Sequence, residues 1–325
     1  MIKFIYDNRI IQLFTLILGV FIFRVLIFET HEYSELVMEQ RGIFRHIINN
    51  VNNMPWFSFG LSTVLIVIQG LLLGHIVFEY NIVDRPGYSI LFFYGLLTAL
   101  FEGTLLMNYV TLGVLFLLLG FLFLYRYLKG KYKRQDLFVT SLFMGMAALC
   151  AQEFFWSMVF LLLILLVFKA TEAGEVFVIV FGILIPYYLI SSVGYLASTE
   201  LNFKSAIKLW NVSLVELSKG GLSSIDLIVI VNLLLVGIFG AFKVFGSYFR
   251  YNVDARRSRL AMGFISIFLL LIFGLKYKHY QEFFVCLSLP LSVYTANLFQ
   301  IERPSFLWRF LFFGYVLSLL SYPFL

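Results

Sequence analysis

Residues 104–125 read TLLMNYVTLGVLFLLLGFLFLY, a run without a single charged side chain. An α-helix rises about 1.5 Å per residue, so about 20 apolar residues cross the roughly 30 Å hydrocarbon core of a bilayer. The strongly basic segment RYLKGKYKR follows directly at 126–134. An apolar run of this length that ends in clustered positive charge is typical of a transmembrane helix whose C-terminal end lies at the membrane surface.

The rest of the chain repeats this pattern. Of 325 residues, 61% are hydrophobic and 13% are charged, whereas a soluble protein carries about 25% charged residues. The apolar runs are continuous and do not alternate with polar positions, which argues against a membrane β-barrel. We therefore predict an all-α fold, a polytopic transmembrane helical bundle of about eleven helices that forms a single integral-membrane domain over residues 1–325.

The expected spans are 9–28, 57–79, 88–101, 104–125, 136–151, 153–168, 175–197, 224–246, 260–275, 281–299 and 306–324. The shortest of them fall below the bilayer thickness, so we expect those helices to be tilted, broken or shielded by their neighbours. The first span is interpreted as a retained helix and not as a signal peptide, because its apolar stretch is too long and no small-residue cleavage site follows it.

The distribution of Lys and Arg predicts the orientation, because cytoplasmic loops retain positive charge. With the N-terminus in the cytoplasm, 16 of the 24 Lys and Arg residues lie inside, 7 lie outside, and Arg24 lies within the first helix. The reversed orientation inverts that ratio. The net charge of +6 is therefore explained by topology and does not indicate a nucleic-acid partner.

This topology gathers acidic residues from distant parts of the chain at the outer face. Charges at helix ends of membrane proteins usually line a polar cavity or pair with each other. The carboxylates placed there are Glu29, Glu32, Glu35, Glu39, Glu102, Glu153 and Glu282, and the basic residues Lys276, Lys278 and His279 join them. This convergence is the main indication of function in the sequence.

Two outer loops, 29–56 and 198–223, are long enough to hold amphipathic helices on the membrane surface. In each loop a stripe of mostly apolar residues recurs at three- and four-residue spacing, as in a surface helix. They are Tyr33, Leu36, Val37, Gln40, Phe44, Ile47, Ile48 and Val51 in the first loop, and Phe203, Ala206, Ile207, Trp210, Leu214 and Leu217 in the second. The two segments can serve equally as plain covers of the bundle or as gates for a substrate.

Several short motifs occur in an order that is familiar from a known family. They are Glu29-x-x-x-Tyr33-Ser34-Glu35-Leu36, Arg85-Pro86-Gly87-Tyr88, Gly145-Met146-Ala147-Ala148-Leu149, and Lys276-x-Lys278-His279-Tyr280 followed by Leu289-Pro290-Leu291. The chain thereby resembles the GT-C superfamily of integral-membrane glycosyltransferases, in particular the aminoarabinose-transferase and protein O-mannosyltransferase branch, without the C-terminal soluble domain of many relatives. It departs from the family motif at Thr30, where a second acid is often found.

The resemblance implies a polyprenyl-phosphate-linked sugar donor, a catalytic acid at Glu29 and a basic cluster beside the lipid phosphate. Such a transfer needs a carboxylate that takes the proton of the acceptor. It also needs positive charge or a metal to stabilise the departing phosphate. Glu29 is the candidate base, and an ion pair with Arg24 is an equally weighted alternative. Glu32 and Glu35 are assigned to acceptor binding or metal assistance in catalysis, against a favoured alternative in which they are simply solvated.

Substrate binding is assigned to Tyr33, Glu102, Glu153, Lys276, Lys278 and His279. The two lysines and His279 fit a phosphate clamp, although lysines at a helix end also anchor to lipid headgroups. Glu102 and Glu153 either line the cavity or simply mark polar turns. Metal binding is not favoured, because His31 and its neighbouring carboxylates offer fewer ligands than a metal site needs, and the cofactor is left open.

The sequence thus predicts a polyprenyl-phosphate-sugar-dependent glycosyltransferase, a multi-pass protein of a bacterial cell inner membrane with a cytoplasmic N-terminus. Its expected partners are the lipid-linked sugar donor, membrane lipids and other membrane proteins. The alternatives are a non-catalytic GT-C-like scaffold subunit and, less favoured, a transporter, which should show paired broken helices and repeat symmetry. Zinc-ligand spacing, a phosphate-binding glycine loop and a nucleophile elbow are all absent from the sequence.

Overall fold

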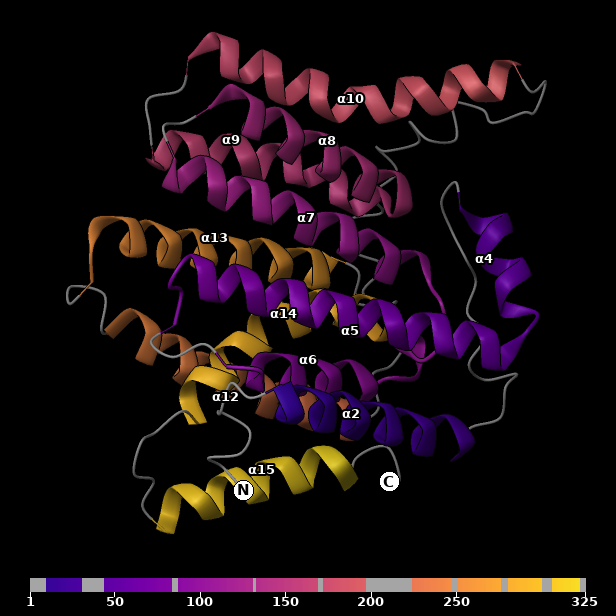
Figure 1. Cartoon of the computed structure of the whole chain (residues 1–325), viewed down its shortest axis with the longest axis vertical. Helices are drawn as coiled ribbons and strands as arrows, with labels where there is room; N and C mark the ends of the chain where they lie inside the picture. The colour runs from indigo at the N-terminus through magenta and orange to yellow at the C-terminus, as the bar shows by residue number, and fades with distance from the viewer. Residues whose placement is uncertain are drawn as a thin grey trace.

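The computed structural model describes residues 10–30, 44–83, 87–130, 133–168, 172–196, 224–246, 251–275, 280–299 and 306–321. Within these ranges every regular element is a helix. The helices run side by side with their long axes nearly parallel, and α4 lies at one end of the bundle (Figure 1). Their bounds are α2 Ile10–Thr30, α4 Arg45–Asn52, α5 Pro55–Glu79, α6 Ser89–Ala99, η1 Glu102–Thr104, α7 Tyr109–Lys129, α8 Arg134–Cys150, η2 Gln152–Trp156, α9 Ser157–Phe168, α10 Ala173–Leu196, α12 Ser224–Gly246, α13 Val253–Leu275, α14 Tyr280–Phe299 and α15 Phe306–Ser321.

Six helices in the described ranges are long and apolar enough to cross a membrane, which makes this a multi-pass helical membrane protein. The six are α2, α5, α7, α10, α12 and α13. Three shorter apolar helices, at Ser89–Ala99, Gln152–Phe168 and Phe283–Phe299, are packed among them. The all-helical membrane architecture is therefore confirmed, while the number of eleven passages stays a prediction.

The ends of several helices meet at one side of the bundle, which we call the basic end. Lys129 Nζ at the end of α7 lies 3.0 Å from Glu79 Oε1 at the end of α5. Arg134 at the start of α8 lies 2.7 Å from Glu172, beside the start of α10. On α12, Lys243 Nζ donates to the backbone oxygen of Leu298 near the end of α14, at 3.3 Å. Lys129, Arg134 and Lys243, three of the residues counted as cytoplasmic from the sequence, thus lie at one end of the bundle.

Several predicted boundaries differ from those of the structure, among them the end of α2 and the beginnings of α7 and α13. Helix α2 continues through Thr30, so Glu29 lies in its last turn and not in a loop. Residues 104–108 precede α7, because Asn108 caps the helix by accepting a hydrogen bond from Thr111 N. Helix α13 begins at Val253, earlier than predicted. Its first two turns carry polar and basic residues, and a prediction based on apolar runs therefore leaves them out.

Close contacts between helices depend on glycine at a few positions. A Cβ atom on Gly145 of α8 would lie 2.6 Å from the backbone oxygen of Ile183 in α10. A Cβ atom on Gly240 of α12 would overlap the backbone oxygen of Tyr294 in α14 and would lie 2.6 Å from its carbonyl carbon. Because backbone atoms cannot move aside as a flexible side chain can, these glycines set the distance between their helices.

The substitution Gly240→Leu should therefore separate α12 from α14. We expect a loss of about 1–3 kcal/mol in the free energy of unfolding, because a well-packed contact is overfilled. The matched control is Gly246→Leu on the same helix, where a Cβ meets no atom within 4 Å. Thermal unfolding in detergent should show a lower Tm for the first variant alone, and equal Tm values would contradict the close contact.

Candidate functional site

The predicted base, Glu29, lies in the last turn of α2 and is exposed. The turn is anchored by Phe28, whose ring centroid lies 5.0 Å from that of Trp56 and 4.7 Å from that of Phe59 on α5. Thr30 Oγ1 donates to the backbone oxygen of Ile27 at 2.7 Å and so closes the helix end. The carboxylate of Glu29 is thus presented from a fixed helix terminus.

Arg24 does not form the ion pair with Glu29 that the sequence offered as an alternative. Its side chain is fully buried and donates to Thr63 Oγ1 at 3.1 Å and to Ser62 Oγ at 3.2 Å. The same guanidinium donates to the backbone oxygens of Thr104 at 2.9 Å and Leu105 at 3.3 Å. The charge of Arg24 is therefore directed into the protein and away from Glu29.

The backbone that Arg24 contacts belongs to a buried segment, residues 100–108, most of which is irregular and which holds the short helix η1. Irregular backbone at membrane depth is tolerated only where protein or water satisfies its polar groups. Met107 N donates to Ser58 Oγ at 2.9 Å, and Asn52 Nδ2 donates to the Met107 oxygen at 3.2 Å. Side chains from α2, α4 and α5 therefore hold this segment and the position of Glu102 within it.

Asn108 connects the segment to α7. Its side chain accepts from Thr111 N at 2.6 Å and donates to the backbone oxygen of Gly103. We expect Asn108→Ala to lower the free energy of unfolding by about 1–2 kcal/mol, because the helix loses its cap and a buried oxygen loses its donor. Asn108→Ser, which keeps a capping oxygen, should recover part of the loss in denaturant titrations, and a smaller loss for Ala than for Ser would contradict the assignment.

The short helices η1 and η2 lie against the beginning of α14. The ring centroids of Phe101 and Phe284 are 4.4 Å apart, and those of Phe154 and Phe283 are 6.5 Å apart. Glu153 lies in η2 and is half-buried. We call the side of the bundle that carries Glu29, Glu102 and Glu153 the acidic end, which is opposite the basic end along the helices (Figure 1).

The acidic end holds only part of the predicted site within the described ranges. Glu29, Glu153 and the backbone of Glu102 are placed there, and Tyr280, the first residue of α14, follows directly after His279 in the sequence. The predicted residues Glu32, Tyr33, Glu35, Lys276, Lys278 and His279 lie outside the described residues, as does the surface helix expected in 198–223. In the first loop, α4 is present, with Ile48 buried and Ile47 exposed.

A set of buried polar residues in the helices was not predicted from the sequence. Gln69 Nε2 donates to the backbone oxygen of Thr111 at 2.6 Å, and Tyr94 Oη donates to Gln69 Oε1 at 2.6 Å. All three residues are buried. A glutamine inside an otherwise apolar span is the signal that could have indicated this link, because polar groups within a membrane need a partner.

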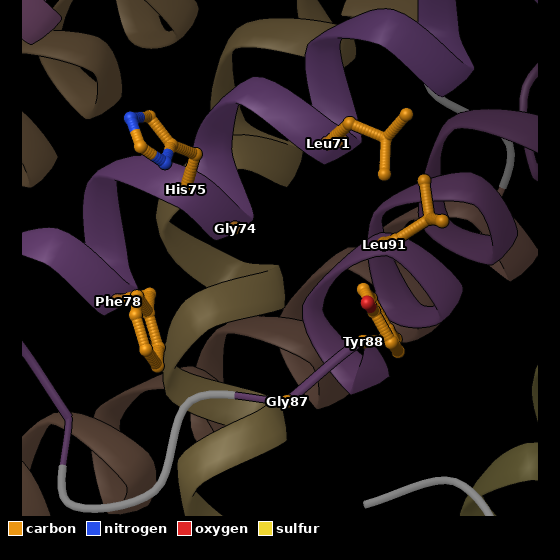
Figure 2. Close-up of a pocket in the computed structure, with 8 residues that line it drawn as sticks. Leu71, Gly74, His75, Phe78, Gly87, Tyr88 and Leu91 are labelled. Carbon is orange, nitrogen blue, oxygen red and sulfur yellow. The ribbon is translucent and has the colours of Figure 1, made fainter. Parts of the chain in front are cut away.

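A cavity of about 330 Å³ lies between α5 and α6, nearer to the basic end. Figure 2 shows that one stretch of α5 and the start of α6 form its walls. Its lining consists of Gly70, Leu71, Gly74, His75, Phe78, Gly87, Tyr88 and Leu91. The sequence analysis did not predict this cavity. Among the described residues, no group of three or more His, Cys, Asp or Glu side chains could hold a metal ion.

The fold and these sites define a multi-pass helical membrane protein with charged groups gathered at two opposite ends. Comparison of the chain with protein-family models, with curated proteins and with solved structures finds no match. Its function therefore has to be argued from the chemistry of its own residues.

Proposed function

We propose that the protein is a glycosyltransferase that moves a sugar or glycan from a polyprenyl-phosphate carrier to an acceptor. In this proposal the basic end faces the cytoplasm of a bacterial cell and the acidic end faces outward across the inner membrane. The positive-inside rule supports the orientation, because Lys129 at the end of α7 and Lys243 at the end of α12 lie on the same side of the bundle.

One observation supports the reaction most directly: three separate elements that each carry a glutamate lie at the end of the bundle where α14 begins. Glu29, Glu102 and Glu153 come from α2, η1 and η2. The pairs Phe101–Phe284 and Phe154–Phe283 connect η1 and η2 to the first turn of α14, which follows the predicted cluster Lys276 to His279. In the proposal a carboxylate at this end takes a proton from the acceptor, and the predicted basic cluster supplies the positive charge that stabilises the leaving phosphate.

In this mechanism Glu29 removes the proton from the acceptor nucleophile, which attacks the anomeric carbon of the sugar. The bond between that carbon and the phosphate oxygen breaks, and the polyprenyl phosphate leaves with both bonding electrons. Lys276, Lys278 and His279 would stabilise the negative charge of the phosphate. Because Arg24 is fully buried and its Nε and Nη2 atoms donate to Thr63, to Ser62 and to the buried segment, it is not assigned to the phosphate.

The proposal is tested by mass spectrometry of surface glycans and of the lipid-linked sugar pool in a deletion strain. We expect one glycan to disappear and its polyprenyl-linked donor to accumulate, and both changes should revert when the gene is restored. Unchanged glycans and donors would reject the proposal. Uptake of a solute into proteoliposomes without any lipid-linked sugar would point to transport instead, and a stoichiometric membrane complex that tolerates substitution of every predicted site residue would point to a scaffold.

A further inference from the structure

We propose that the cavity between α5 and α6 binds a glycerophospholipid of the leaflet at the basic end, with one acyl chain between the helices and the phosphate-containing headgroup at the end of the cavity that His75 and Tyr88 line. The volume of about 330 Å³ is at the lower end of the range for small-ligand sites. This inference concerns the opposite end of the molecule from Glu29 and does not depend on the proposed glycosyl transfer.

The position of the cavity indicates a lipid as its occupant. Leu71 and Phe78, which line it, are 37% and 58% exposed on a helix that is long and apolar enough to cross the membrane. What surrounds such a surface in a bilayer is lipid and not water, so an acyl chain is the molecule that reaches this opening. Leu91 on α6 contributes a further apolar wall (Figure 2).

Two glycines give the cavity its shape. Gly74 is open, because a Cβ placed there meets no atom within 4 Å. Gly70, one turn earlier on α5, is closed by α6, because its Cβ would lie 2.5 Å from Leu91 Cδ1. The helices therefore touch at Gly70 and leave space at Gly74, so the cavity ends at Gly70 and continues toward the end of the helix at Glu79.

The polar groups lie at the depth of a lipid headgroup. His75 is four residues before the last residue of α5, which corresponds to about 6 Å along the helix axis. Gly70 lies about 14 Å from the same helix end, at the level of the acyl chains. His75 is exposed, and Tyr88, at the start of α6, is half-buried. An imidazole N–H and a phenol O–H both donate hydrogen bonds, which suits the oxygens of a phosphate.

The nearby charges are compatible with a phosphate. Glu79 follows His75 by one turn, and its carboxylate lies 3.0 Å from Lys129 Nζ, which also donates to the Glu79 backbone oxygen at 3.1 Å. The negative charge of Glu79 is thus compensated by a lysine. The predicted orientation would place this site in the cytoplasmic leaflet, and the lipid would then hold the α5–α6 pair at that surface.

The test is native mass spectrometry of the full chain, released from nanodiscs made with phosphatidylglycerol and phosphatidylethanolamine. We expect the wild-type chain to retain one phospholipid. Gly74→Leu, which adds a side chain to the cavity wall at a position where a Cβ meets no atom within 4 Å, should lose it. The matched control is Gly60→Leu, at a position of α5 that is equally open but lies outside the cavity, and this variant should retain the lipid.

A second variant, His75→Leu combined with Tyr88→Phe, distinguishes recognition of the lipid phosphate from binding of the acyl chain. In nanodiscs that contain equal amounts of phospholipid and phosphate-free diacylglycerol, the wild-type chain should retain phospholipid, while the double variant should retain both lipids equally. Equal lipid retention by Gly74→Leu and Gly60→Leu would overturn the proposal. A wild-type dimer that Gly74→Leu abolishes would also overturn it, because a second copy would then cover the cavity.

Discussion

The substitution Arg24→Ala should produce the largest loss of stability of any single change at the acidic end. It leaves a large cavity in the protein and removes the donor of the Leu105 oxygen, which Arg24 contacts at 3.3 Å. We expect the free energy of unfolding to fall by about 3–5 kcal/mol, the range found when a large buried side chain is cut to alanine. The measurement is thermal unfolding in detergent or nanodiscs, followed by tryptophan fluorescence.

Two further variants separate the causes of that loss. Arg24→Met keeps most of the side-chain length but makes no hydrogen bond, and it also removes a buried charge, so its loss should be smaller, about 1–3 kcal/mol. Arg126→Ala is the exposed control, because its ion pair with Asp136 spans 3.5 Å and its side chain is 63% exposed. A pair of this kind contributes about 0–1 kcal/mol. An Arg24→Ala variant as stable as Arg126→Ala would contradict the structural role of Arg24.

The helical fold could be predicted because the hydrocarbon core imposes a length and a composition that are visible in the sequence. Gly113 and Gly120 lie within the apolar run of α7, and the helix continues through both. At each of these positions a ring or a neighbouring helix packs closely against α7. The boundaries were harder to predict. Asn108 begins α7, but the apolar residues before it belong to the buried segment 100–108, and no apolar pattern distinguishes a buried irregular segment from a helix.

The partners of buried polar residues could not be read from the sequence. Arg24 donates to Ser62 and to the Thr104 oxygen, which are 38 and 80 positions away along the chain. An argument from helix geometry alone pairs Arg24 with Glu29, because both lie on the same helix. The pairing that forms is decided by the packing of α2 against α5 and the buried segment, and this packing is a property of the tertiary fold.

The site at the acidic end was predicted from topology. The sequence predicts Glu29, Glu102 and Glu153 on one face, and η1 and η2, which hold the last two, lie against the beginning of α14. The cavity between α5 and α6 was not predicted, because its shape depends on the difference between Gly70, which is closed, and Gly74, which is open. These two glycines look equivalent in the sequence.

The substitution Glu29→Gln should have the largest effect on the proposed reaction. A general base contributes about 10²–10⁴-fold to a rate, so transfer from the lipid-linked donor should fall by that factor. Folding should be unchanged, because Glu29 is exposed and the contacts of Phe28 and Thr30 hold the helix end without its carboxylate. The measurement is the initial rate of transfer in nanodiscs, with Tm recorded for each variant.

Matched variants at both ends of the bundle then decide which carboxylate acts. The control is Glu79→Gln at the basic end, which removes the charge of another exposed carboxylate. The transfer rate should stay at the wild-type value, because Glu79 pairs with Lys129 at the end of the bundle opposite the proposed reaction. Glu102→Gln and Glu153→Gln at the acidic end should raise KM more than they lower kcat if they only bind the substrate. A wild-type rate for Glu29→Gln, combined with a loss of kcat in Glu102→Gln or Glu153→Gln, would move the base to that residue. Because both belong to short helices packed on the first turn of α14, the reaction would then be centred on η1 and η2 and not on the end of α2.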